Sequence, residues 1–203
     1  MILKPRLFLA VITMLLVSSG CATYQPARTD NICSIFRGDT SWYKSARDAN
    51  KRWGTPVWVI MAIVDQESRF VSDAQPERDW FLFIPLPRRS SAYGYAQAQD
   101  PVWEKYMKDT GNSGDDRDDF ADAINFVGWY TNMTQRTLGI SKWDAYHQYL
   151  AYHEGQGGYK SGSWKRKGWL KQVANKVRNK SAAYNAQLKK CKPELDDKVN
   201  SWF

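Results

Sequence analysis

The segment from Thr55 to Phe70 constrains the fold of this chain more than any other segment does. Thr55-Pro56 is a helix start signal, with Thr as the N-cap and Pro in the first helical position. From Val57 to Val64 every side of the predicted helix is apolar, which is typical of a buried helix. The helix becomes polar only at residues 65–67. We therefore expect a central helix that is covered by other elements.

Helical patterns also cover most of the remaining sequence. We expect further helices over residues 41–53, 100–110, 115–138, 143–153 and 164–190. Residues 72–91 differ, because they hold three prolines and the apolar run Trp80–Ile84. We interpret them as a long loop or a short hairpin. The predicted fold class is therefore mainly α, with at most a small β element.

The first twenty residues have the features of a targeting segment. Lys4 and Arg6 precede an apolar run from Leu7 to Val17, and small residues at 18–20 lead into Cys21. This order is typical of a secretory signal peptide. The alternative is an uncleaved membrane anchor, but the run is shorter than the roughly 20 apolar residues that span a bilayer.

Cys21 resembles the lipid-bearing cysteine of a bacterial lipobox, although Ser18 stands where Leu is usual. Ala22 follows it in place of Asp, and in the enteric sorting pattern this implies the outer membrane. We expect an outer-membrane lipoprotein that faces the periplasm and is held to the membrane through its lipid. The predicted segments are residues 1–20 as signal peptide, residues 21–32 as lipidated N-terminus and tether, and residues 33–203 as one domain.

If Cys21 carries lipid, Cys33 and Cys191 remain as a pair in an oxidising compartment, where disulfides persist. A bridge between them closes almost the whole domain into one loop. In the chain-entropy model such a loop contributes roughly 4–5 kcal/mol of stability. The alternative is two separate buried thiols.

The charge and the aromatic content both suit a glycan partner in the cell envelope. The full chain has a formal charge of +8, and the predicted signal peptide removes Lys4 and Arg6 but no acid, which leaves about +6. Excess positive charge suits an anionic polymer, although a solvated basic face is the alternative. The 10 Trp and 11 Tyr offer rings that stack on sugars. Export of the chain argues against nucleic acid as a partner.

Glu67 is the candidate catalytic residue, at the end of the buried helix. The negative end of the helix dipole and the apolar neighbours both disfavour its charged form, so both raise its pKa. A carboxyl that stays protonated near neutral pH can donate a proton to a glycosidic oxygen. Asp65 lies about 200° around the helix and cannot share the site.

Four short motifs resemble those of the soluble lytic transglycosylases, which share the fold of goose-type lysozyme. They are E-S-x-F at Glu67–Phe70, G-Y-A-Q at Gly94–Gln97, A-Y-H-E-G at Ala151–Gly155, and Tyr184 in the last helix. The family has G-L-M-Q and A-Y-N-x-G in the second and third. The gap between the first two motifs is also long. These departures concern substrate subsites more than the reaction class.

The resemblance implies that Glu67 protonates the oxygen between MurNAc and GlcNAc in peptidoglycan. The C6 hydroxyl of the same MurNAc then attacks its own C1, and the product is 1,6-anhydroMurNAc. Gln97 and the backbone of the second motif, with Gly94 and Tyr95, are expected to position the N-acetyl group of the sugar or Glu67. No cofactor is expected.

Three further residues complete the predicted site. Tyr152 and Tyr184 are expected to form hydrogen bonds around the Glu67 carboxyl, although each is alternatively an ordinary core tyrosine. Ser68 is expected to cap or orient the chain locally and not to act as a nucleophile, because no glycine follows it and no histidine base is near it in the sequence.

Two other functions remain open at this stage. The first is a lysozyme-type hydrolase, in which Glu154 is the second carboxylate, although we expect Glu154 to point to solvent. The second is a glycan-binding lipoprotein without activity. A metal site is not expected, because His147 and His153 are six residues apart and do not share a helix face.

Overall fold

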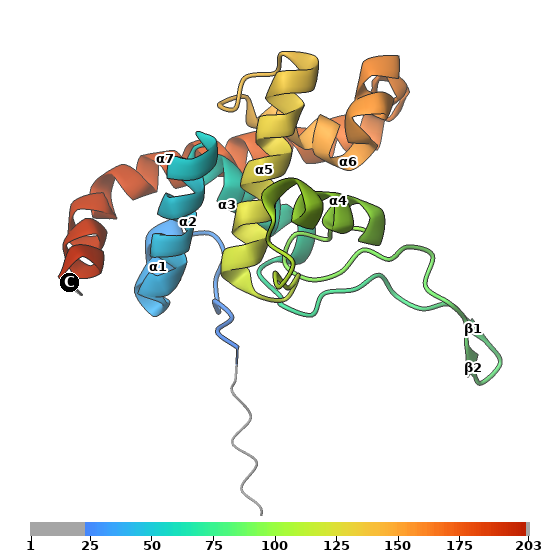
Figure 1. Ribbon diagram of the computed structural model, residues 1–203, viewed down its shortest axis with the longest axis horizontal. Coiled ribbons are helices and arrows are strands. Elements are labelled where there is room, and N and C mark those ends of the chain that lie inside the picture. Colours follow the sequence, from blue (N-terminus) through green and yellow to red (C-terminus); the bar gives the residue numbers. More distant parts are fainter. Residues whose placement is uncertain (1–22, 202–203) are drawn as a thin grey trace, which may run out of the picture.

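The computed structural model describes residues 23–201 as a mainly helical domain (Figure 1), which confirms the predicted fold class. The predicted signal peptide and Cys21 lie outside the described residues. Among the described residues, no helix combines the length and the apolarity needed to cross a membrane.

The central helix is α3, Val57–Ser68, and all of its apolar residues except the partly exposed Trp58 are buried. Four helices pack around it, namely α2 (Thr40–Trp53), α5 (Phe120–Leu138), α6 (Ala145–Ser161) and α7 (Gly168–Asn200). The all-apolar pattern therefore predicted its place in the core correctly.

The start of α3 differs from the prediction. Pro56 occupies the N-cap position without a side-chain cap, and the helix begins at Val57. The Thr55 hydroxyl forms a hydrogen bond with the Thr131 hydroxyl of α5 at 2.7 Å instead of capping α3. A tertiary contact thus replaces the expected local one.

Other helices also have different bounds. α5 begins at Phe120 and not at residue 115, because Asp119 is the N-cap and accepts a hydrogen bond from the backbone N–H of Asp122. α6 continues to Ser161 through a kink at Gly155, where φ is 71°. A short 3-10 helix, η1 (Ser163–Arg166), precedes α7, which extends to Asn200. α4, Asp100–Thr110, has the predicted bounds.

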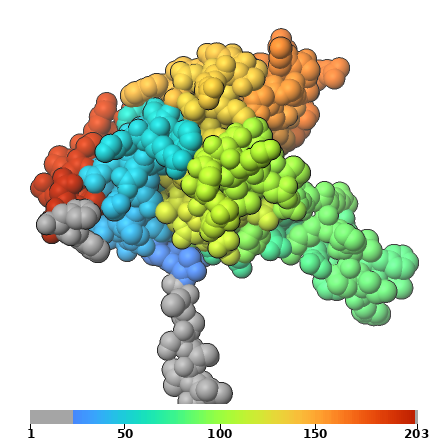
Figure 2. Space-filling view, viewed as in Figure 1, coloured from blue at the N-terminus to red at the C-terminus, as the bar shows by residue number. Residues whose placement is uncertain are grey.

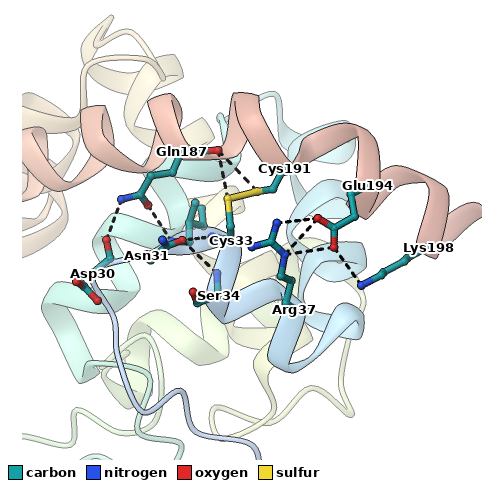
Figure 3. The surroundings of a disulfide bond; sticks show 10 residues. Asp30, Asn31, Cys33, Ser34, Arg37, Gln187, Cys191, Glu194 and Lys198 are labelled. Atoms are coloured by element: carbon teal, nitrogen blue, oxygen red, sulfur yellow. Dashed lines mark hydrogen bonds and ion pairs between the residues drawn. A yellow bond between two sulfur atoms is a disulfide. The ribbon is translucent and has the colours of Figure 1, made fainter.

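A short helix that the sequence did not predict, α1 (Ile32–Gly38), is linked to α7 by a disulfide. Cys33 and Cys191 form the bond across 158 positions of sequence (Figure 3), which confirms the predicted pairing. Beside it, the Gln187 side chain accepts a hydrogen bond from Ile32 N at 3.0 Å. The two ends of the domain are therefore held together covalently and by hydrogen bonds.

Residues 23–31, which the sequence suggested as part of a tether, pack along the domain. The Tyr24 hydroxyl donates to Ile35 O at 3.1 Å, and its ring meets Trp42 edge-on with centroids 4.9 Å apart. Thr29 O accepts hydrogen bonds from Lys180 and Tyr184.

Strands β1 (Trp80–Phe81) and β2 (Ile84–Pro85) form a small antiparallel hairpin. The hairpin projects away from the helical body at the end of a long loop (Figures 1 and 2). The loop-or-hairpin expectation for this region is therefore correct.

Candidate active site

Glu67 is the penultimate residue of α3, at the negative end of that helix. The residue is partly exposed, but its Oε1 is fully buried and has no hydrogen-bond partner among the described residues. Burial raises the pKa of the Glu67 carboxyl to about 7, while the Tyr149 hydroxyl acts in the opposite direction. Glu67 is therefore a carboxyl that holds a proton near neutral pH.

The chain makes an unusual turn directly after Glu67. Arg69 and Phe70 both adopt left-handed backbone conformations, with φ of 53° and 62°. The Ser68 hydroxyl holds this turn, because it accepts from Phe70 N at 3.1 Å and donates to Val64 O at 3.3 Å. Left-handed residues other than glycine are strained and are frequent at functional sites. The Ser68 hydroxyl is therefore engaged with the backbone of this turn, and its expected role in orienting the site stays a prediction.

Two tyrosines of α6 face Glu67. Tyr149 and Tyr152 are three residues apart, a spacing that puts them on one side of the helix. The pKa of each hydroxyl is raised, first by burial and then by the charge of Glu67. The Tyr152 hydroxyl donates to Ala96 O at 2.6 Å, so it also holds the second motif. Tyr152 thus links Glu67 to the turn at Gly94–Gln97.

The turn at Gly94–Gln97 contains two residues with a left-handed backbone conformation. Gly94 has φ of 76°, and a Cβ there would collide with the carbonyl of Arg117. Gln97 is also left-handed, with φ of 48°, and its amide nitrogen donates to Ala74 O at 2.8 Å and Gly94 O at 2.9 Å. Gly94 therefore has a structural role in this turn.

Tyr95 does not contribute its side chain to a substrate surface. It is fully buried and packs edge-on against Trp42 and Phe120, with ring centroids 5.6 and 5.5 Å away. Its ring joins the core because α2 and α5 enclose it, and the expectation that the backbone of the second motif positions the substrate stays a prediction.

A groove of about 270 Å³ lies between the second and third motifs. Its lining consists of Gln97, Ala98, Gln99, Val102, Phe126, Tyr130, Tyr152, His153, Glu154 and Gly155. Gln97 and Tyr152 therefore line one groove. Glu67 is not part of this lining, and Tyr152 connects the groove to it.

Glu154 does not point to solvent, and this corrects the expectation from the sequence. Its side chain is only 5% exposed, and it pairs with Lys167 Nζ at 2.7 Å and with His153 Nδ1 at 3.1 Å. Its other oxygen accepts from the Ser163 hydroxyl. Although burial raises the pKa of Glu154, the hydrogen bonds from Lys167, Ser163 and His153 together lower it to about 2. The glycine kink that follows turns α6 toward these partners.

Tyr184 is not beside Glu67, which corrects another expectation. Its hydroxyl donates to Thr29 O, and Asp65 and Asp30, not Glu67, are the charges that raise its pKa after burial does. Asp65 pairs with Lys180 of α7 at 3.0 Å. α7 therefore packs against the side of α3 that carries Asp65, on the opposite side from Glu67.

Tyr149 and Tyr130 were not singled out in the sequence. The ring of Tyr130 packs against Tyr152 with centroids 4.9 Å apart, and Tyr130 lines the groove. The spacing of Tyr149 three residues before Tyr152 was the available signal for the first. No local pattern marks Tyr130, because its contact depends on how α5 packs on α6.

The comparison with protein families decides the affiliation of the chain. Residues 9–191 match the model of the transglycosylase SLT domain. The chain belongs to this family. The match covers every residue of the candidate site and confirms the resemblance that the four motifs carry. No curated protein matches the chain.

Transglycosylase SLT domains act on peptidoglycan, so the substrate polymer of this SLT domain is peptidoglycan and its place of action is the cell envelope. In the candidate active site, Glu67 at the end of a buried helix is the group that can donate a proton. It also offers a groove whose walls come from the second and third motifs.

Proposed function

We propose that this protein is a lytic transglycosylase that cleaves the β-1,4 bond between MurNAc and GlcNAc, with Glu67 as the catalytic acid. One observation carries the proposal. The Glu67 carboxyl has a pKa of about 7 and keeps partial exposure, so a substrate can meet a carboxyl that is protonated at neutral pH.

The proposed reaction needs a single carboxyl. Glu67 donates its proton to the GlcNAc oxygen as the bond from MurNAc C1 to that oxygen breaks. The resulting carboxylate then accepts the proton of the MurNAc C6 hydroxyl, whose oxygen bonds to C1. The products are a free GlcNAc hydroxyl and 1,6-anhydroMurNAc, and Glu67 is again protonated. Because the nucleophile belongs to the substrate, the closing step is intramolecular.

The neighbouring tyrosines support the charge change in this cycle. Tyr149 favours the carboxylate form of Glu67, since its hydroxyl lowers the Glu67 pKa. Tyr152 fixes the second motif through Ala96 O, and Gln97 closes the turn on itself. We propose Gln97 and Tyr152 as groove residues that contact the glycan, and Ser68, Gly94 and Tyr95 as residues that position the backbone around it.

The hydrolase alternative requires a second carboxylate that activates water. Asp65 is paired with Lys180 away from Glu67, so it does not serve. Glu154 borders the groove, but both of its oxygens are engaged and its pKa is about 2. A carboxylate with so low a pKa is a weak base, because base strength falls with pKa. The charges around Glu154 therefore favour the transglycosylase.

Digestion of purified peptidoglycan, followed by mass spectrometry, tests the proposal. We expect wild-type digests to contain muropeptides that end in 1,6-anhydroMurNAc, one water lighter than hydrolysis products and resistant to borohydride. Glu67→Gln should bind sacculi but release no muropeptides. Glu154→Gln is the matched control, and its products should still be anhydro forms. Reducing ends in the wild-type digest, or full activity of Glu67→Gln, would refute the proposal.

We also propose that the mature protein is a lipoprotein, with lipid on Cys21, directed to the outer membrane. Mass spectrometry of the mature N-terminus tests this, since the first residue should be a lipid-bearing Cys21. A mature chain that begins at any other residue would contradict it.

A further inference from the structure

The hairpin and its flanks form an exposed apolar projection, here called the apolar hairpin (residues 80–86). Its large side chains are all exposed, up to 77% for Leu82 and 93% for Phe83. They stand away from the helical body, as the space-filling view shows (Figure 2). A contiguous exposed apolar surface of this kind is typical of an interaction site, whereas single exposed apolar residues are common on protein surfaces.

The backbone of the apolar hairpin is largely satisfied internally. Phe81 pairs with Ile84 and Trp80 with Pro85, and Leu86 N donates to Asp79 O at 2.9 Å. Pro85 has no backbone N–H to leave unpaired. The paired strands can therefore lie at a lipid interface, but the hairpin is too short to cross a membrane.

A cationic pocket of about 440 Å³ lies at the base of the apolar hairpin. Its lining consists of Gln75, Arg78, Arg88, Ser90, Ser91, Ala92, Tyr93, Asp100 and Arg117. Asp100 is paired with Arg117 at 2.8 Å, so the charge of Arg78 and Arg88 is in excess there. The Nε of Arg88 is buried and has no hydrogen-bond partner among the described residues. An anionic oxygen in the pocket would supply that missing acceptor.

The apolar tip and the cationic pocket are close enough to meet one amphiphilic ligand. Phe83 and Arg88 are five residues apart, at most about 17 Å along an extended strand. Interfacial segments enter the headgroup and acyl boundary by about 5–10 Å. With the tip at that depth, the pocket is near enough to the headgroup layer for a phosphate group to reach it.

We propose that the apolar hairpin and the cationic pocket form a docking site for a membrane surface with anionic phospholipids, the tip in the acyl boundary and a headgroup phosphate in the pocket. A projecting tip that carries Trp, Phe, Leu and Ile above arginines suits a lipid interface, because tryptophan and arginine both favour that layer.

Vesicle sedimentation tests the proposal with residues 22–203, which exclude Cys21 and the apolar run at Leu7–Val17. This chain keeps the disulfide and every buried core residue, all of which lie between Ile32 and Val199. We expect it to bind vesicles of phosphatidylcholine, and to bind vesicles of phosphatidylcholine with phosphatidylglycerol more tightly. Loss of one buried Phe or Leu side chain corresponds to at least about a tenfold change in an equilibrium constant. Leu82→Ser/Phe83→Ser should therefore weaken binding by about 100-fold.

Two further variants separate the tip from the pocket. Arg78→Gln should weaken binding only to vesicles that contain phosphatidylglycerol, because it removes pocket charge and leaves the tip intact. Trp143→Ser is the matched control, since Trp143 is 66% exposed but lies outside the apolar hairpin, and its binding should equal that of the wild type.

Absence of wild-type binding to both kinds of vesicle would overturn the proposal, and so would undiminished binding of Leu82→Ser/Phe83→Ser. An unchanged preference for phosphatidylglycerol in Arg78→Gln would overturn the part played by the pocket. Cleavage of lipid-free sacculi by Leu82→Ser/Phe83→Ser should match the wild type, so these results are independent of the proposed reaction.

Discussion

The substitution Glu67→Gln should change the stability of the protein in a way that depends on pH. Burial raises the pKa of the Glu67 carboxyl from 4.5 to about 7. Between these two values the folded chain keeps a proton that the unfolded chain has lost. The free energy of unfolding therefore falls as the pH rises through this window, because the unfolded state is the one that ionises readily. Glutamine has no such titration.

The magnitude follows from the size of the shift. Each pKa unit corresponds to about 1.4 kcal/mol, so the rise from 4.5 to about 7 corresponds to about 3 kcal/mol in the wild type above pH 7. Below pH 4.5 the carboxyl is protonated in both states, and the penalty vanishes. The free energy of unfolding of Glu67→Gln, measured relative to that of the wild type, should therefore increase by about 3 kcal/mol as the pH rises from acid to mildly alkaline.

Urea unfolding of both proteins at pH 4 and pH 8 measures the difference. The disulfide stays intact in urea, so the comparison concerns the same unfolded chain in both proteins. At pH 8 the variant should unfold at a higher urea concentration although it is inactive. If the gap between the two proteins is the same at both pH values, the reasoning on the buried carboxyl is refuted.

Three other predictions rest on particular contacts. Tyr149→Phe removes the hydroxyl that lowers the Glu67 pKa, so the alkaline limb of the pH–rate profile should move to higher pH. Tyr184→Phe is the control and should leave the profile in place. Equal profiles for the wild type and Tyr149→Phe would contradict this. Cys33→Ala/Cys191→Ala opens a loop of 158 positions and should lower the free energy of unfolding by about 5 kcal/mol, measured in urea; a loss below about 1 kcal/mol would argue against a stabilising bridge. Gly94→Ala places a Cβ against the Arg117 carbonyl at a left-handed position and should cost about 3 kcal/mol, measured by thermal or urea unfolding. A neutral Gly94→Ala would show that the second motif tolerates another backbone path.

The sequence alone determined those features that depend on residues close together in the chain. The all-apolar run at Val57–Val64 predicted a buried helix, and the prolines around Trp80–Ile84 predicted a loop or hairpin. Both follow from periodicity and backbone restriction, which act over a few residues. The position of Glu67 at a helix end could be predicted as well, because it also depends only on residues close by in the chain. The Cys33–Cys191 pairing could be predicted because the chain offers few cysteines.

Only the tertiary structure decided which side chains meet Glu67. Tyr149 and Tyr184 are both buried tyrosines on helices that pack against α3, and their local sequence does not say which side of α3 each one meets. α6 covers the side of α3 that carries Glu67, whereas α7 covers the side that carries Asp65. The packing of whole helices also decided that Tyr95 lies in the core and that Glu154 pairs with Lys167. Such contacts join residues far apart in sequence, so they depend on how whole helices pack, and a local pattern does not contain that information.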